Sequence, residues 1–213
     1  MSSGFRAEHD FLGEKQIPAD AYWGVHTARA VENFPISGTQ VSAMPDLIRA
    51  FGFVKKAAAR ANAELGAIDR KRAAAIMSAC EKLIAGKYHE QFVVDVIQGG
   101  AGTSTNMNAN EVIANIALEA MGHEKGEYQH LHPNNDVNMA QSTNDAYPTA
   151  IRIGLLLGHD FLLTALDKLI QSFAAKGLEF GHVLKMGRTQ LQDAVPMTLG
   201  QEFRAFATTL GED

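Results

Sequence analysis

Neutral hydrogen-bond donors are concentrated in a glycine-rich stretch at residues 99–110 (GGAGTSTNMNAN), which contains no charged side chain. Glycine lets a backbone approach a ligand closely, and Ser, Thr and Asn side chains can donate hydrogen bonds to it. An apolar helical pattern follows, so we expect the stretch to lead into a helix N-terminus, whose unpaired N–H groups attract anions. The stretch is therefore predicted to hold a carboxylate or a phosphate.

Two further segments carry neutral donors. Residues 142–145 (STND) lie directly before a long apolar pattern. Because one helix cap needs only one such residue, four in succession favour a second ligand-facing helix N-terminus. Residues 185–198 are predicted to form a loop, and Thr189 and Gln190 are among its neutral polar side chains. Three such clusters suit a small dicarboxylate: removing a proton beside a carboxylate creates a doubly charged aci-carboxylate, which preorganised donors stabilise.

Composition narrows the class of protein. The chain has 213 residues, of which 46% are hydrophobic, so it can bury a core. The formal net charge of −5 argues against nucleic-acid binding. A single cysteine, Cys80, is expected to be a buried structural thiol and fits a reducing compartment. Residues 1–15 carry no secretory pattern, and charges interrupt the apolar region 151–173, so we expect a soluble, cytoplasmic protein without a membrane span.

Hydrophobic periodicity predicts a mainly α fold. Helices are expected over residues 45–65, 70–85, from the donor-rich loop to Gly122, over about 148–180, and from residue 201 onward. Asp69 is the expected N-cap of the second helix. The first forty-odd residues are expected to be irregular, residues 122–148 mostly loop with one helical turn, and no strand set is predicted. The long helix is apolar around much of its circumference, which implies burial against a partner subunit or further chain.

Four segments together resemble the aspartase/fumarase superfamily. They are residues 18–27 (PADAYWGVHT), 99–111 (GGAGTSTNMNANE), 141–149 (QSTNDAYPT) and 187–201 (GRTQLQDAVPMTLGQ). Gln190, where fumarases carry His, favours the aspartase branch over class II fumarases. The resemblance implies an N-terminal helical domain at residues 1–141, then the first long helices of a central helix bundle at residues 142–213, incomplete here, within a homotetramer.

The resemblance also implies residue roles. Thr103, Ser142 and Thr143 would bind the substrate carboxylates, Asn144 would contact the substrate near its α-carbon, and Thr189 would complete the pocket. Asn106 and Gln190 would support them. The family's proton-removing serine lies on a mobile loop whose motif is not among these residues, so no catalytic residue is assigned. Residues 132–135 match a secondary anion site of fumarases, although a simple turn is preferred there.

The implied activity is the elimination of ammonia from L-aspartate to give fumarate, with no cofactor and no metal. The chain by itself is expected to be inactive. The alternatives are a class II fumarase and a non-catalytic module that binds dicarboxylates or mediates oligomerisation. Nucleotide binding at residues 99–102 is disfavoured because no strand precedes the glycines and the phosphate-loop lysine is missing. The eight histidines show no compact ligand spacing, so His123, His130 and His132 are expected to be solvated or packed.

Overall fold

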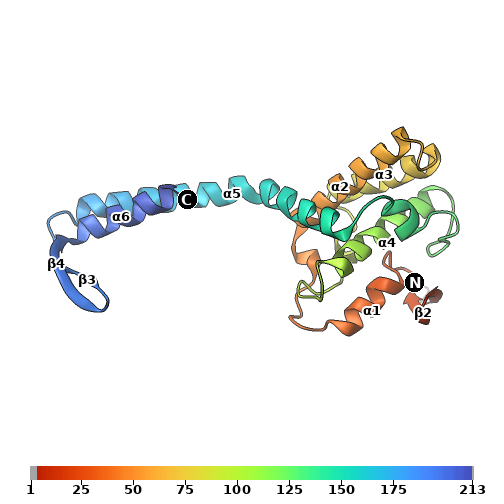
Figure 1. The fold of residues 1–213 in the computed structure, drawn as a ribbon, viewed down its shortest axis with the longest axis horizontal. Helices are drawn as coiled ribbons and strands as arrows, with labels where there is room; N and C mark the ends of the chain where they lie inside the picture. The colour runs from red at the N-terminus through yellow and green to blue at the C-terminus, as the bar shows by residue number, and fades with distance from the viewer. Residues whose placement is uncertain (1–3, 213) are drawn as a thin grey trace. The chain divides into compact units, whose positions relative to one another are not determined.

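The computed structural model describes residues 4–212. Residues 1–3, which belong to the segment 1–15 in which no secretory pattern is expected, lie outside the described residues. The chain divides into two compact units, Met1–Leu157 and Gly158–Asp213, each described separately below. The division falls within the long helix α5 (Thr143–Glu179) (Figure 1). The domain boundary expected between residues 141 and 142 stays a prediction. The mainly α class is confirmed.

The N-terminus is more regular than the sequence suggested. Strands β1 (Phe5–Asp10) and β2 (Gly13–Pro18) pair antiparallel with Phe5 opposite Pro18, and helix α1 (Val25–Asn33) follows. The expectation of an irregular lead-in was wrong because the hairpin lacks a simple apolar alternation. It buries Glu8 as well as Ile17, so a charged side chain occupies a position where a strand pattern requires an apolar one.

Three predicted helices form the centre of the first unit. They are α2 (Pro45–Glu64), α3 (Arg70–Ile84) and α4 (Thr103–Ala120), and Figure 1 shows α2 and α3 side by side. Asp69 caps α3 as expected, because its side chain accepts the N–H groups of Lys71 and Arg72. The fully buried core side chains include Ile48, Phe51, Ile76, Leu83, Phe92, Ile113, Ile116 and Leu131. Cys80 is buried among them, as predicted.

Short irregular elements connect these helices. The 3₁₀ turns η1 (Val41–Ala43) and η2 (His89–Gln91) lie on either side of α2 and α3 in the sequence. The segment between α4 and α5 contains one π-helical turn, η3 (Pro133–Val137), as the sequence suggested. Helix α5 begins at Thr143, five residues before the expected start at Pro148. Pro148 is the sixth residue of this helix, so its missing N–H removes one intrahelical hydrogen bond, the one to the carbonyl oxygen of Asn144.

The second unit contains the later part of α5, a β-hairpin and helix α6 (Leu199–Glu212). The hairpin pairs β3 (Leu184–Thr189) with β4 (Gln192–Thr198), so the expectation of a loop at residues 185–198 was wrong. Phe203 of α6 lies 5.8 Å from Phe173 and 5.6 Å from Phe180 between ring centroids. Gly200 permits close contact, since a Cβ there would collide with the backbone of Gly177 and Gly181.

Helix α5 exposes many large apolar side chains, including Leu155, Leu156, Phe161, Leu162 and Leu178. It is long and apolar enough to cross a membrane, by length and composition alone. The core helix of a soluble bundle meets the same criterion. The expectation that the chain has no membrane span therefore stays a prediction.

Candidate functional site

The N-terminus of α4 presents the donors of the glycine-rich stretch. Gly102, the residue before the helix, has a φ of +81°, a conformation that glycine adopts without strain. Thr103 is exposed, whereas Thr105 and Asn106 are buried. Gln98 Oε1 accepts the Thr105 N–H at 2.9 Å, and the N–H groups of Thr103 and Ser104 have no protein partner among residues 4–212. The exposed first turn of α4 can therefore donate to an anion.

The N-terminus of α5 is the second donor group. Ser142 precedes the helix, and its Oγ accepts the N–H of Asn144 at 3.1 Å. Its carbonyl oxygen accepts the N–H of Asp145 and of Ala146, which starts the helical pattern. Ser142 and Asn144 are exposed and Thr143 is half-buried. Ser142 thus acts as a cap, while its exposure and that of Asn144 leave their polar atoms accessible to a ligand.

These two helix N-termini lie next to each other. Asn106 Nδ2 donates to Thr143 Oγ1 at 3.4 Å, a long contact that joins α4 to the first residue of α5. Gly102 makes the approach possible, because a Cβ at this position would collide with the Tyr147 ring of α5. Asn106 Oδ1 is buried without a hydrogen-bond partner among the described residues. The structure therefore places the N-terminus of α4, which carries Thr103 and Asn106, next to the N-terminus of α5, which carries Ser142, Thr143 and Asn144. Both helix N-termini attract anions.

A buried lysine of α2 is connected to these helix N-termini by hydrogen bonds. Lys55 of α2 is fully buried, and its Nζ donates to Asn138 Oδ1 at 2.9 Å and to Gln141 Oε1 at 3.0 Å. Asn138 Oδ1 also accepts from Asn106 Nδ2 at 3.1 Å, so the lysine is linked to the site through one amide. Burial lowers the pKa of Lys55 to about 7, since desolvation disfavours the charged form. Sequence reasoning missed this residue, although a lysine within the apolar stripe of a helix was a usable signal.

A buried carboxylate fixes α1 beside α4. Glu111 of α4 is fully buried, and its Oε2 accepts the N–H groups of Gly24 and Thr27 at 2.8 and 3.1 Å and the Thr27 hydroxyl at 2.6 Å. Its Oε1 accepts the N–H of His26 at 2.9 Å and lies 3.1 Å from Nδ1 of the same histidine. Hydrogen bonding to this carboxylate raises the pKa of His26. Sequence reasoning also missed Glu111.

Thr103 faces a surface cavity of about 570 Å³ that is also lined by His26 and Arg29. Arg29 is oriented by Asp10, to which it donates two hydrogen bonds of 2.8 Å. The bonds from Arg29 hold the pKa of Asp10 below its ordinary value. Glu32 also lines this cavity and Arg29 is paired with Asp10, so these side chains give the cavity no clear excess of positive charge. The attraction for an anion there rests on the N–H groups at the start of α4.

The other predicted residues belong to the second unit. Thr189 ends β3, and Gln190 follows it in the hairpin turn with a φ of +51°. Both side chains are exposed. The structure therefore assigns Thr189 and Gln190 to an exposed turn, and their predicted contribution to the pocket stays a prediction.

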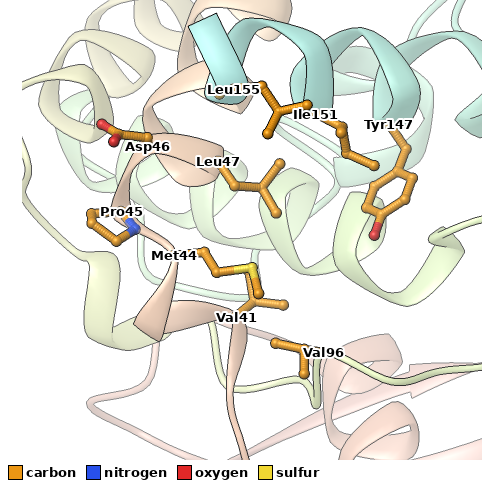
Figure 2. A pocket seen from close by; sticks show the side chains of 10 residues that line it. Val41, Met44, Pro45, Asp46, Leu47, Val96, Tyr147, Ile151 and Leu155 are labelled. Carbon is orange, nitrogen blue, oxygen red and sulfur yellow. The ribbon is translucent and has the colours of Figure 1, made fainter. Parts of the chain in front are cut away.

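A separate cavity of about 390 Å³ in the first unit is apolar. Figure 2 shows Leu47, Met44, Val41 and Val96 facing Ile151, Leu155 and Tyr147 of α5. Few polar atoms line it, so a dicarboxylate would lose hydration there without gaining hydrogen bonds. The helix N-termini therefore suit an anion better than this cavity does.

His132 belongs to a local turn. Its Nδ1 accepts the N–H groups of Asn134 and Asn135 at 3.1 and 3.2 Å, which caps η3. This arrangement agrees with the preferred interpretation of residues 132–135 as a turn. By contrast, His123 and His130 stack against each other, with ring centroids 3.8 Å apart, and Glu127 lies beside them. This grouping was not predicted from the sequence, because the histidines show no compact ligand spacing there.

The sequence of this chain matches a known protein family. The family model described as "Lyase" matches residues 13–213, which is nearly the whole chain. The chain belongs to this lyase family. Among curated relatives, it is 72% identical over 212 residues to the aspartate ammonia-lyase of Pseudomonas fluorescens, covering 100% of this chain and 44% of that protein. It is 58% identical over 214 residues to the aspartate ammonia-lyase of Escherichia coli K12, covering 100% of this chain and 45% of that protein.

Solved lyase structures agree with this membership. The structure titled fumarate lyase:delta crystallin from Brucella melitensis bound to cobalt matches with a TM-score of 0.84 and 60% identity, over 98% of this chain and 45% of that one. A class II fumarase from Schistosoma mansoni matches with a TM-score of 0.79 and 35% identity, over 98% of this chain and 44% of that one. The chain thus spans less than half the length of the lyases that it matches.

Proposed function

We propose that this chain supplies the carboxylate-binding part of an aspartate ammonia-lyase, which converts L-aspartate to fumarate and ammonia. The observation that carries the proposal is the pair of adjacent helix N-termini, joined through Asn106 and Thr143, in a chain of the lyase family. Their exposed donors are hydroxyl, amide and backbone N–H groups, which suit a substrate with two carboxylates. The identity of 58–72% to relatives named aspartate ammonia-lyase supports this substrate over malate, the substrate of a fumarase.

In the proposed reaction, a base removes a proton from the β-carbon of L-aspartate. The electron pair moves into the adjacent carboxylate and forms an aci-carboxylate with two negative charges. When the pair returns, it forms the carbon–carbon double bond, and the bond to nitrogen breaks to release ammonia. Donors that hold this intermediate more tightly than the substrate lower the barrier, and the chemistry requires no cofactor.

Each predicted residue has a role in this scheme. Thr103, Ser142 and Thr143 bind the carboxylates, and Asn144 contacts the substrate near its α-carbon. Asn106 holds Thr143 in place, and Lys55 orients Asn106 through Asn138. Thr189 and Gln190 keep the substrate-binding and supporting roles that the resemblance implies. The base is proposed to be the family's loop serine, which is not among these residues.

The assembly and location of the protein are also proposals. The exposed apolar side chains of α5 support its burial in the helix bundle of a homotetramer, because such a surface is costly in water. Such an assembly would leave α5 in a protein core rather than in a membrane. The single buried cysteine is consistent with a cytoplasmic location.

The test is a substrate comparison with the protein that carries this chain. Formation of fumarate is followed by its ultraviolet absorbance, with L-aspartate or L-malate as substrate. We expect fumarate and ammonia from L-aspartate and no turnover of L-malate. Fumarate from L-malate alone would favour the class II fumarase, and saturable binding of dicarboxylates without turnover would favour a non-catalytic module.

A further inference from the structure

The turn after α4 brings three potential metal ligands together. His123, Glu127 and His130 each offer a ligand atom, and these atoms all lie within 4.8 Å of one another. His123 Nδ1 lies 3.6 Å from Glu127 Oε2, and the two imidazole rings are stacked with an interplanar angle of 8°. All three residues are half-buried. The cluster is separate from the proposed carboxylate site, because the 18 residues of α4 place its two ends roughly 27 Å apart.

The spacing is close to that of a bound metal. Three atoms within 4.8 Å of one another leave a point that lies within about 2.8 Å of all of them, and ligand bonds to Zn²⁺ are about 2.0–2.2 Å long. Inward movement of under about 1 Å therefore completes the contacts. A ring nitrogen binds a metal in the plane of its ring, and the two ring planes are nearly parallel, so one ring must tilt for both nitrogens to reach the same ion. The His123 side chain is 28% exposed, which leaves it room to do so.

The turn itself holds the ligands near one another. Gly122 and Gly126 have φ values of +85° and +86°, which reverse the chain twice within five residues. The N–H of His123 donates to Leu118 O, and the N–H of Glu124 donates to Glu127 Oε2 at 3.0 Å. The second bond orients the carboxylate, as outer contacts do for metal ligands.

The electrostatic surroundings favour a cation. The cluster follows the C-terminus of α4, where the helix dipole is negative. Arg6 of β1 lies against Gly126 of the same turn and is paired with Glu8 at 2.8 Å. Lys125, the one Lys or Arg within residues 122–130, is directed elsewhere. Its Nζ donates to the carbonyl oxygens of Ala19 and Asp20, lies 3.7 Å from Glu119, and lies 4.3 Å from the centre of the Tyr22 ring.

We propose that His123, Glu127 and His130 form a binding site for a divalent transition metal ion such as Zn²⁺ or Co²⁺. Two imidazole nitrogens and one carboxylate oxygen are the donor set that these ions prefer, and water fills the remaining position. The ion stabilises the turn. This turn also carries Gly126, whose N–H donates to Asn115 Oδ1 at 2.8 Å, and Tyr128, whose hydroxyl donates to the Glu8 carboxylate. Metal binding therefore strengthens the attachment of the N-terminal hairpin to α4.

The test is metal binding by the purified protein, freed of metal by chelation and kept at mildly alkaline pH, because protons compete with metal ions for ligand atoms. Equilibrium dialysis against Zn²⁺ gives the stoichiometry, and the visible absorption of Co²⁺ reports on its ligands. We expect one ion per chain. His130→Gln, His123→Gln and Glu127→Gln should each weaken binding at least about 100-fold, since changes outside the ligand shell alone cost about 10- to 100-fold.

Matched controls separate this cluster from other exposed groups. His159→Gln changes an exposed histidine in the second unit, and Glu124→Gln changes an exposed carboxylate of the same turn. Both should retain full binding, and circular dichroism checks that each variant is folded. The proposal is overturned if the unchanged protein binds no Zn²⁺ at millimolar concentration. It is also overturned if the three ligand variants bind as tightly as the two controls. Neither result bears on turnover of L-aspartate, so the proposed function is tested separately.

Discussion

Glu111 gives the sharpest test of how the first unit is held together. Its buried carboxylate accepts the N–H groups of Gly24, His26 and Thr27 and the hydroxyl of Thr27. The oxygen that accepts the His26 N–H, Oε1, also lies 3.1 Å from Nδ1 of His26. The N–H groups belong to the start of α1, where no intrahelical partner exists. Replacing Glu111 with Gln preserves the shape of the side chain but removes the charge and one of the two acceptors.

The magnitude follows from these contacts. The amide oxygen of Gln can replace Oε2, but the amide nitrogen then faces the N–H of His26, which leaves a buried donor unsatisfied at a cost of about 1–3 kcal/mol. The three remaining bonds become neutral, and each weakens by up to about 1 kcal/mol, because bonds to a charged acceptor are the stronger kind. We expect Glu111→Gln to lower the free energy of unfolding by about 3–5 kcal/mol.

The assay is urea denaturation followed by the fluorescence of Trp23, the one tryptophan of the sequence, which adjoins Gly24. The control is Glu119→Gln, on the same helix. Glu119 is exposed, accepts one hydrogen bond from the Tyr22 hydroxyl at 2.6 Å and pairs with Lys125 at 3.7 Å, so its replacement should cost at most about 1 kcal/mol. Equal stabilities of the two variants would refute the role assigned to the Glu111 carboxylate.

Three further predictions concern single residues. The pKa of Lys55 is about 7 in the folded protein, below its ordinary value of 10.5, so the unfolded chain binds the extra proton and stability rises with pH above about 7. Lys55→Met should remove this rise, measured by urea denaturation at about pH 7 and about pH 8.5; an unchanged slope contradicts the assignment. Asp69→Ala should cost about 1 kcal/mol of stability by loss of the α3 cap, and no loss would refute that cap. Gly102→Ala should lower the midpoint of thermal unfolding, because alanine is strained at the positive φ of this position and its Cβ would collide with the Tyr147 ring. An unchanged midpoint would contradict this close approach.

The helices could be predicted from the sequence because local signals agree with the packing. Pro45 begins α2, Asp69 caps α3, and apolar residues recur at helical spacing along α4. The polar stretches before α4 and α5 likewise indicated helix N-termini. Their adjacency could not be derived from local signals, because it depends on the absence of a side chain at Gly102 beneath Tyr147.

Other features depend on contacts between residues far apart in the sequence. Glu8 and Glu111 are charged, so their local patterns do not indicate burial. At the start of α1, however, Glu111 accepts three N–H groups and Glu8 accepts that of Val25. The β3–β4 hairpin was missed because its strands are largely exposed and carry little apolar alternation. The cluster of His123 and His130 was missed because the chain reversals at two glycines, rather than helical spacing, bring these rings together.

The central claim is that the N-termini of α4 and α5 bind the substrate carboxylates, and Thr103→Val tests it most directly. The Thr103 side chain is exposed, and its hydroxyl has no hydrogen-bond partner among residues 4–212, so the substitution should leave stability unchanged. We expect kcat/KM for L-aspartate to fall about 10²- to 10³-fold, as for loss of one donor to a developing oxyanion. Thr39→Val, at another exposed threonine, should retain full activity. An unchanged kcat/KM in Thr103→Val would contradict the claim.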